Sequence, residues 1–392
     1  MEICETRSRD YLEPADVGGV SVRNRIFRSA TEEGLADGAG LPTEALTRRY
    51  EALAKGEAGC IITGYIGVSK EGESSIRGMC LLDSDDKVPA YREMVERVHA
   101  AGAPIIAQIA HCGRNGRMGR AGKVGRLSET QIRQIVDDFA AAARRCREAG
   151  FDAVQLHCAH VYLLAEFLSP TTNRRRDRWG GSTENRFRVV SEIMLRIREE
   201  CPGYPVFVKM NGSEAEGYRK SVEEAVRVAA LMELAGVAAI EVSCGINNRR
   251  LGAIKGQIPT DMILQEWPGV AELPAFAKAA LRPLVPLVIG RPKSDRLYNL
   301  EAARRIKAQV SAPVILVGGV AGTRDIEEAL AGGMDAVSMC RPLILEPGLV
   351  RKIKTSKQTQ ARCIKCNYCL VGIERHPLRC YYGHLPKEGV QA

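Results

Sequence analysis

The sequence has 392 residues, 45% hydrophobic and 26% charged, which predicts a soluble globular protein with one large domain and an appendage. No run of eighteen apolar residues is present, and the charged start MEICETRSRD lacks a secretory apolar block, so we expect a cytoplasmic protein without a membrane span. The net charge of +9 is dispersed among 47 acidic residues without an aromatic-studded basic stripe, which disfavours nucleic acid as a partner and favours an anionic cofactor or substrate.

Short β-rich runs alternate with amphipathic segments, a rhythm that predicts βα units and a parallel sheet. Strands are expected at residues 23–29, 58–63, 104–109, 151–157, 205–210, 238–243, 313–319 and 335–340. The helix expected at residues 128–150 begins with a capping box of Ser128 and Gln131 and ends at Gly150. Eight such units indicate a (β/α)8 TIM barrel. A doubly wound open sheet is the alternative, but its Gly-rich phosphate turn after an early strand is missing.

Two segments fall outside this rhythm. Residues 245–299 carry six prolines, and we interpret them as an active-site loop or lid rather than a separate domain. After Glu346 the pattern ends and leaves one terminal helix and a cysteine-rich tail. We therefore divide the chain into a barrel at residues 1–355 and a C-terminal extension at residues 356–392.

The reactive side chains of a TIM barrel project from the carboxyl ends of its strands. His157 ends the fourth strand, and His160 and Tyr162 follow in its loop. Two imidazole N–H groups can converge on one oxygen and stabilise the charge that develops there, while a phenol delivers a proton nearby. A zinc site on the same pair is disfavoured because no other histidine is convincingly spaced as a third ligand.

Other strand ends point to a bound cofactor. Gln108 can both donate to and accept from a flat heterocycle, and Lys209 can place a cation against a delocalised anion. Gly318 and Gly319 follow the seventh strand and Arg341 follows the eighth, where backbone N–H groups and an arginine commonly hold a phosphate. Together these residues predict a phosphorylated planar cofactor across the mouth of the barrel.

The segment LHCAHVYLLAEFLSPTTNRRRDRWGGSTENR, residues 156–186, resembles the signature of the old yellow enzyme family of FMN-dependent NADH:flavin oxidoreductases. The resemblance is strongest to the branch near 2,4-dienoyl-CoA reductase and trimethylamine dehydrogenase. Supporting matches are RNRIFRSAT, AQIAHCGR, VKMNG, and ILVGGV followed by DAVSMCRPLI. The resemblance spans roughly residues 10–380 and implies a TIM barrel that carries FMN.

The resemblance also implies residue roles. The residues that match FMN contacts are Ser29, Ala30, Thr31, Gly64, Gln108, Lys209, Gly318, Gly319, Cys340 and Arg341. His157 and His160 match the pair that binds the substrate carbonyl oxygen, and Tyr162 matches the proton donor. The implied reaction is ene-reduction: hydride passes from reduced FMN to the β-carbon of an α,β-unsaturated carbonyl compound, and Tyr162 protonates the α-carbon.

Two departures from the family pattern bear on these roles. Val161 stands where the family usually has glycine, and a β-branched residue does not easily adopt positive φ, so we expect the loop carrying Tyr162 to turn differently. Cys340 replaces the usual glycine before the phosphate arginine but still supplies its backbone N–H. Two alternatives stay open: amine oxidation, although only 5% of residues are aromatic, and an electron-transfer subunit with a degenerate pocket.

Of the thirteen cysteines, nine are scattered singly and are expected as buried thiols. The other four form the pattern C-x2-C-x2-C-x10-C at Cys363, Cys366, Cys369 and Cys380. In a reducing compartment this spacing is typical of a metal site, with a disulfide as the weaker alternative, and four thiolates suit either an iron–sulfur cluster or zinc. The resemblance favours a [4Fe–4S] cluster, because that branch holds one with a closely similar array.

The reductant has two possible sources. Larger members of that branch continue into nucleotide-binding domains that take electrons from NAD(P)H, whereas this sequence ends at Ala392. We therefore expect either NAD(P)H docking directly over the flavin or a separate electron-donor protein acting through the cluster, and favour the second. The expected substrate is a small unsaturated carbonyl compound, and assembly into a homo-oligomer is left open.

Overall fold

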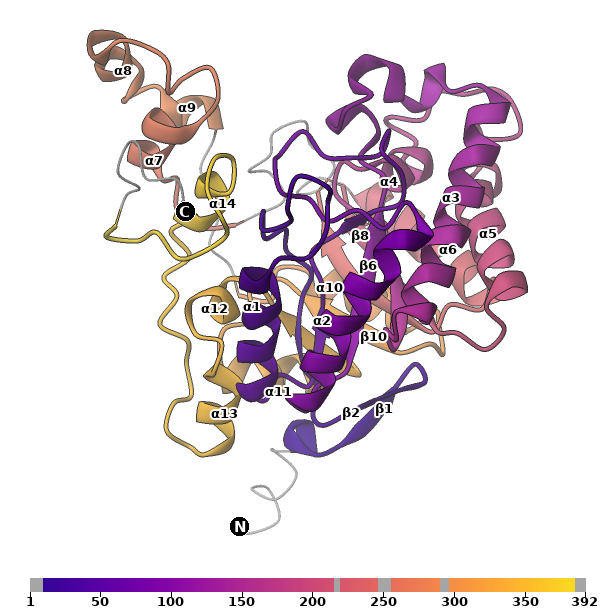
Figure 1. Cartoon of the computed structure of the whole chain (residues 1–392), viewed down its shortest axis with the longest axis horizontal. Coiled ribbons are helices and arrows are strands. Elements are labelled where there is room, and N and C mark those ends of the chain that lie inside the picture. The colour runs from indigo at the N-terminus through magenta and orange to yellow at the C-terminus, as the bar shows by residue number, and fades with distance from the viewer. Residues whose placement is uncertain (1–9, 215–218, 246–254, 290–295, 385–392) are drawn as a thin grey trace.

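The computed structural model describes residues 10–214, 219–245, 255–289 and 296–384. Eight parallel strands form a closed barrel, because β4 pairs with both β3 and β6 (Figure 1). The barrel strands are β3 (Ile26–Arg28), β4 (Cys60–Ile62), β6 (Ile105–Ala110), β7 (Ala153–Cys158), β8 (Val206–Ser213), β9 (Ala239–Cys244), β10 (Val314–Val317) and β11 (Ala336–Met339). Each lies within or overlaps a predicted strand, so the TIM-barrel prediction is confirmed. The two-residue strand β5 (Ile66–Gly67) extends the pairing of β6.

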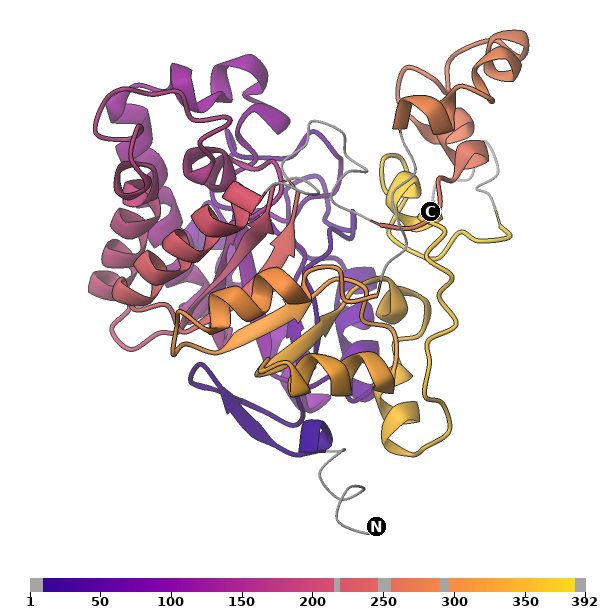
Figure 2. The same cartoon turned by 180° about the vertical axis from the view of Figure 1, so that it is seen from behind.

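Helices cover the outside of the barrel between successive strands (Figures 1 and 2). The outer helices are α1 (Glu44–Lys55), α2 (Val88–Ala100), α3 (Glu129–Glu148), α5 (Thr183–Glu200), α6 (Arg219–Leu234), α10 (Leu300–Lys307), α11 (Thr323–Ala331) and α13 (Leu349–Lys354). The predicted capping box of α3 is present, since Ser128 and Gln131 exchange backbone and side-chain hydrogen bonds of 2.9 and 3.2 Å. None of the helices in the described ranges is long and apolar enough to cross a membrane.

An antiparallel hairpin that the sequence pattern did not predict closes one end of the barrel. It consists of β1 (Ala15–Val17) and β2 (Val20–Val22), joined by Gly18 and Gly19 at positive φ. Its valines pack against inward-facing barrel residues such as Phe27 and Ile106. Three-residue strands are too short to give a periodic signal, which explains the omission. Because the hairpin closes this end, the opposite end is left to hold a ligand.

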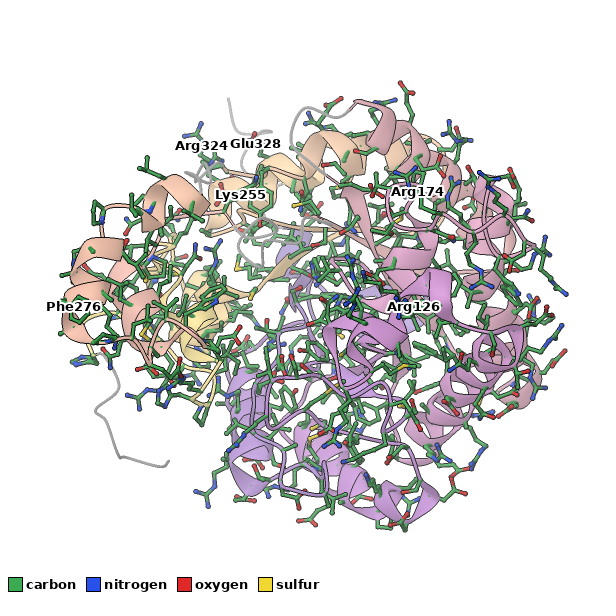
Figure 3. All side chains as sticks on the ribbon, turned by 90° about the horizontal axis from the view of Figure 1, so that it is seen from above. Arg126, Arg174, Lys255, Phe276, Arg324 and Glu328 are labelled. Carbon is green, nitrogen blue, oxygen red and sulfur yellow. The ribbon has the colours of Figure 1, made fainter. Side chains whose placement is uncertain are left out.

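The segment predicted as a loop or lid at residues 245–299 is partly helical. Its described part contains α7 (Thr260–Glu266), α8 (Ala275–Leu281) and α9 (Val285–Ile289), and residues 246–254 and 290–295 lie outside the described residues. These helices lie beside the C-terminal tail, away from the outer helices (Figures 1 and 2). Met262 and Ile263 of α7 pack on Val371 and Tyr381 of the tail. Phe276 of α8 is 79% exposed at the outer edge (Figure 3).

The tail follows α12 (Arg341–Leu345) and α13. Its described part, up to residue 384, contains α14 (Tyr368–Gly372) in addition to the terminal helix expected from the sequence. Residues 356–362, here named the strap, run from the barrel to the cysteines. The strap lies along the loop after β10, where Thr323 N donates to Thr359 O at 2.9 Å and Ala361 N donates to Ala321 O at 2.8 Å. These bonds tie the tail to the side of the barrel where a phosphate is expected.

Glu346 fixes the strap to the barrel. Its carboxylate is 1% exposed and accepts hydrogen bonds from Lys352 Nζ at 3.0 Å, from Arg362 N at 2.7 Å and from Arg362 Nε at 3.0 Å. Burial by itself raises the pKa of Glu346, but these hydrogen bonds outweigh it and lower the pKa to about 2. The carboxylate therefore stabilises the fold above its ordinary pKa of 4.5, and this stabilisation is lost as the pH falls towards 2.

Replacing Glu346 by glutamine should loosen the strap. We expect the free energy of unfolding to fall by about 1–3 kcal/mol at pH 7, because a buried acceptor of several hydrogen bonds loses its charge. Urea unfolding measures this loss, and limited trypsin digestion should cut faster at Lys357 and Arg362. The exposed Glu301→Gln serves as the control. Equal stability and equal cleavage in both variants would contradict this role of Glu346.

Candidate active site

A cavity of about 350 Å³ lies at the carboxyl ends of the strands, a size in the range of small-molecule sites. The predicted residues that line it are Ser29, Ala30, Thr31, Gln108, His157, His160, Tyr162, Lys209, Gly318, Gly319, Cys340, Arg341, Cys363 and Cys369. The structure thus brings together residues from six strand ends and from the tail. Gly64, Cys366 and Cys380 were predicted as well but do not line the cavity.

Gly64 is needed for packing behind the cavity wall. A Cβ at this position would overlap the side chain of Glu33 and the carbonyl of Thr31. Glu33 is held by Arg28, which is 2% exposed and also donates to the carbonyls of Ser29 at 2.7 Å and Ile62 at 3.0 Å. The guanidinium therefore fixes the backbone on which Ser29 to Thr31 face the cavity. Gly64 leaves room for the Glu33 carboxylate that pairs with it.

The two predicted imidazoles meet in the cavity. Their ring centroids are 5.1 Å apart, with the rings edge to face. His160 N donates to Asn211 Oδ1 at 3.0 Å, and His160 Nε2 lies 3.0 Å from Ser243 Oγ. The left-handed turn expected of the family's glycine occurs one residue earlier, because His160 has φ 61° and Val161 is not among the residues with positive φ. Asn211 holds this turn, so Val161 avoids the strained conformation.

Both imidazoles are neutral at physiological pH. Burial lowers the pKa of His157 well below its ordinary value, and His160 and Lys209 lower it further. Burial and then Lys209 lower the pKa of His160 to about 3. A neutral imidazole carries one donor and one acceptor nitrogen. The Nδ1 atom of His157 is buried without a hydrogen-bond partner in the described part of the chain, and such an atom calls for a ligand.

Tyr162 lies beside the imidazoles and begins a chain of hydroxyl groups. Its ring centroid is 4.8 Å from that of His157, and its hydroxyl donates to the Tyr65 hydroxyl at 3.0 Å. The Tyr65 hydroxyl in turn donates to Glu32. Burial raises the pKa of Tyr65, and the Glu32 charge raises it further, so Tyr65 keeps its proton. Tyr65 and Glu32 line the cavity but were not predicted, although Tyr65 directly follows Gly64.

A polar network inside the barrel supports Lys209 and Gln108. Lys209 Nζ donates to Ser29 Oγ at 2.8 Å and lies 3.3 Å from Glu241 Oε2. Gln108 donates to Gln155 at 2.7 Å, and Gln155 donates to Glu241 at 3.0 Å. The strand register pairs Gln108 with Gln155 and Lys209 with Glu241. The rule that functional residues lie at strand ends selects Gln108 and Lys209 but not Gln155 and Glu241, which lie further inside their predicted strands. A polar side chain inside an apolar strand is the signal that points to them.

The residues predicted for phosphate binding gather on one side of the cavity. Gly318 and Gly319 have φ of 125° and 83°, and a Cβ on Gly318 would overlap the side chains of Asn299 and Tyr298. Cys340 Sγ lies 3.0 Å from Thr31 Oγ1. This side of the cavity is thus bounded by glycine backbone, which can approach an anion closely.

Arg341 joins this side of the cavity to the tail. Its guanidinium donates to Asn367 Oδ1 at 2.5 Å and to Lys255 O at 2.6 Å. Asn367 is 1% exposed and stands between Cys366 and Tyr368. The arginine predicted for the phosphate therefore also holds the backbone that carries the cysteines.

All cysteines in the described part of the chain are free thiols. Of the nine predicted as buried, six are buried, Cys80 and Cys340 are half-buried, and Cys4 lies outside the described residues. Within the described ranges, no three His, Cys, Asp or Glu side chains are arranged to hold a metal ion. Burial raises the pKa of the Cys369 thiol. The iron–sulfur cluster stays a prediction.

Comparison with known proteins agrees with the fold. The family model described as "NADH:flavin oxidoreductase / NADH oxidase family" matches residues 10–123 and 120–247. Among solved structures, a 2-naphthoyl-CoA reductase in complex with 2-naphthoyl-CoA has a TM-score of 0.77 at 23% identity, covering 95% of this chain and 56% of that one.

Two curated relatives illustrate the range of similar proteins. The chain is 29% identical to a 4,4'-dithiodibutanoate disulfide reductase from Rhodococcus erythropolis, covering 92% of both proteins. It is 28% identical to an N,N-dimethylglycine/sarcosine dehydrogenase from Chromohalobacter salexigens, covering 92% of this chain and 50% of the relative. The chain spans about half the length of several curated relatives that it matches. From the match to the family model, the chain belongs to the NADH:flavin oxidoreductase / NADH oxidase family.

Proposed function

We propose that the chain is an FMN-dependent ene-reductase that acts on α,β-unsaturated carbonyl compounds. The observation that carries this proposal is the pair of neutral imidazoles, 5.1 Å apart in the cavity, with His157 Nδ1 lacking a partner in the described residues and Tyr162 alongside. Neutral N–H donors at the cavity wall suit an oxygen that gains negative charge during the reaction.

FMN fits the donor set of the cavity. Ser29 to Thr31, Gln108 and Lys209 would hold its ring system, and Gly318, Gly319, Cys340 and Arg341 would hold its phosphate. When bound and reduced, FMN supplies a hydride to the β-carbon of the substrate. The protein supplies the rest of the site, with glycine backbone for the anion and a cation for the ring.

The protein's own residues complete the addition. His157 and His160 stabilise the charge on the carbonyl oxygen, and Tyr162 gives its proton to the α-carbon. Tyr162 then recovers a proton from solvent by way of half-buried Glu32 and Tyr65, once the hydrogen bonds from Tyr162 to Tyr65 and from Tyr65 to Glu32 have reversed direction. One hydride and one proton are thereby added to the double bond.

For the tail we propose a [4Fe–4S] cluster on Cys363, Cys366, Cys369 and Cys380. Its support is the four-thiolate spacing, the reach of Cys363 and Cys369 into the cavity wall, and the ties of the strap and Arg341 to the phosphate side. A cluster supplies single electrons, which a separate electron-donor protein would deliver, whereas NAD(P)H would act directly at the flavin. Zinc in the same four thiolates is the alternative.

Amine oxidation is the second candidate. Tyr65, Tyr162, Trp267 and Tyr298 line the cavity together with Glu32, and aromatic faces beside a carboxylate favour a cationic substrate. The similarity to an N,N-dimethylglycine/sarcosine dehydrogenase points the same way. Although only 5% of the residues in the chain are aromatic, four of them line this cavity.

An anaerobic assay separates the two functions. The reduced protein should be reoxidised by a cyclic enone, and the oxidised protein should not be reduced by a tertiary amine. His157→Ala should slow reoxidation by the enone about a hundredfold, because one hydrogen-bond donor to the developing charge is lost. Reduction by the amine would contradict ene-reduction, and an unchanged rate in His157→Ala would favour an electron-transfer subunit.

The protonation state of the imidazoles can be measured directly. Since the pKa of His160 is lowered to about 3 and that of His157 also lies far below 6.5, their ring ¹⁵N shifts should stay those of neutral rings from pH 8 down to 5. The exposed His99 is an internal control, because its hydrogen bond to Asp152 raises its pKa. As the pH falls below 6.5, His157 and His160 bind protons in the unfolded chain but not in the folded protein. The free energy of unfolding therefore decreases. Titration of His157 near pH 6.5 would contradict the neutral pair.

A further inference from the structure

Glu241 is a carboxylate sealed inside the barrel wall. It is 0% exposed on β9 and does not line the cavity. It accepts from Ser29 Oγ at 2.8 Å and from Gln155 Nε2 at 3.0 Å, and Lys209 Nζ lies 3.3 Å from it. Burying an ionised carboxylate without hydrogen-bond partners would strongly destabilise the fold, and these contacts offset that cost. An apolar residue at this position would have no such cost.

Each hydrogen-bond or ion-pair partner of Glu241 either lines the cavity or contacts a residue that lines it. Ser29 and Lys209 line it directly, and Gln155 reaches it through Gln108. All of these side chains are at most 4% exposed. The carboxylate therefore acts on whatever occupies the cavity without touching it, which makes Glu241 a positioning residue.

The Glu241 carboxylate also determines how the side-chain amides of Gln155 and Gln108 are oriented. An ionised carboxylate only accepts hydrogen bonds, so Gln155 must turn its NH2 group towards Glu241. The oxygen of Gln155 then faces Gln108 and accepts from its NH2 group at 2.7 Å. This leaves the oxygen of Gln108 as the acceptor offered to the cavity, where the imide N–H of a flavin ring would need one.

The charge of Glu241 opposes the charge of Lys209. Reduction of a flavin by two electrons adds negative charge at its pyrimidine side, where Lys209 is expected to lie, and a cation there favours the reduced form. A buried carboxylate 3.3 Å from the ammonium cancels part of that effect. The net field at the cavity wall is then set by the pair and not by the lysine alone.

We propose that Glu241 tunes the reduction potential of the bound flavin, holding it more negative by offsetting Lys209 and by fixing the amide of Gln108. This inference rests on the proposed binding of FMN. A more negative potential makes the reduced flavin a stronger hydride donor. The carboxylate thereby favours hydride transfer to the substrate and disfavours reduction of FMN by its electron donor.

The test is the midpoint potential of FMN in the purified holoprotein, measured by anaerobic spectroelectrochemistry. Glu241→Gln should favour reduced over oxidised FMN about tenfold or more relative to the parent, which for a two-electron couple is a positive shift of about 30 mV or more. Glu241→Asp keeps the charge and should stay closer to the parent potential than Glu241→Gln. The matched control is Glu224→Gln, which alters a buried ion pair to Arg186 among the outer helices and should leave the potential unchanged.

A double variant covers the case in which Glu241→Gln does not fold. Lys209→Gln combined with Glu241→Gln removes both charges and leaves no unpaired ion, and its potential should stay near that of the parent. A strongly negative shift in the double variant would mean that Lys209 acts alone and would overturn the inference. So would a folded Glu241→Gln protein that binds one FMN per chain at the parent potential. Failure of the parent protein to bind FMN would instead overturn the proposed function.

Discussion

Closure of the parallel sheet is the constraint on which the site depends. Because β4 pairs with both β3 and β6, all eight strands point the same way around one ring and deliver their last residues to one mouth. The β1–β2 hairpin closes the other end with apolar side chains. Ser29 and Lys209, which are 180 positions apart in the chain, thereby come within hydrogen-bond distance at 2.8 Å.

Two different parts of the chain form opposite sides of the barrel mouth. On one side, side chains inside the barrel build a buried network in which Glu241 and Lys209 carry opposite charges. On the other side, the tail is fixed to the loop after β10 and to Arg341, and it brings thiols to the cavity wall. The first depends on strand register and the second on Glu346 and the strap. The cavity between them holds two imidazoles kept neutral by burial.

The eight barrel strands were predictable because buried parallel strands are continuous apolar runs, and the residues just after them follow from the barrel rule. Short elements were not, since β1, β2 and α14 have too few residues for a period to appear. Glu241 was missed because it lies within a strand, and Tyr65 because its role depends on Glu32 and Tyr162. The turn at His160 could not be inferred from Val161, since it depends on Asn211 from the next strand.

The most direct test of this account is the FMN content of the chain purified without air. We expect about one FMN per chain, seen as flavin absorption bands that disappear on reduction with dithionite, and tight rebinding after the flavin is stripped. A folded protein, verified by its circular dichroism, that is colourless and takes up no added FMN would contradict the central claim that this cavity is a flavin site.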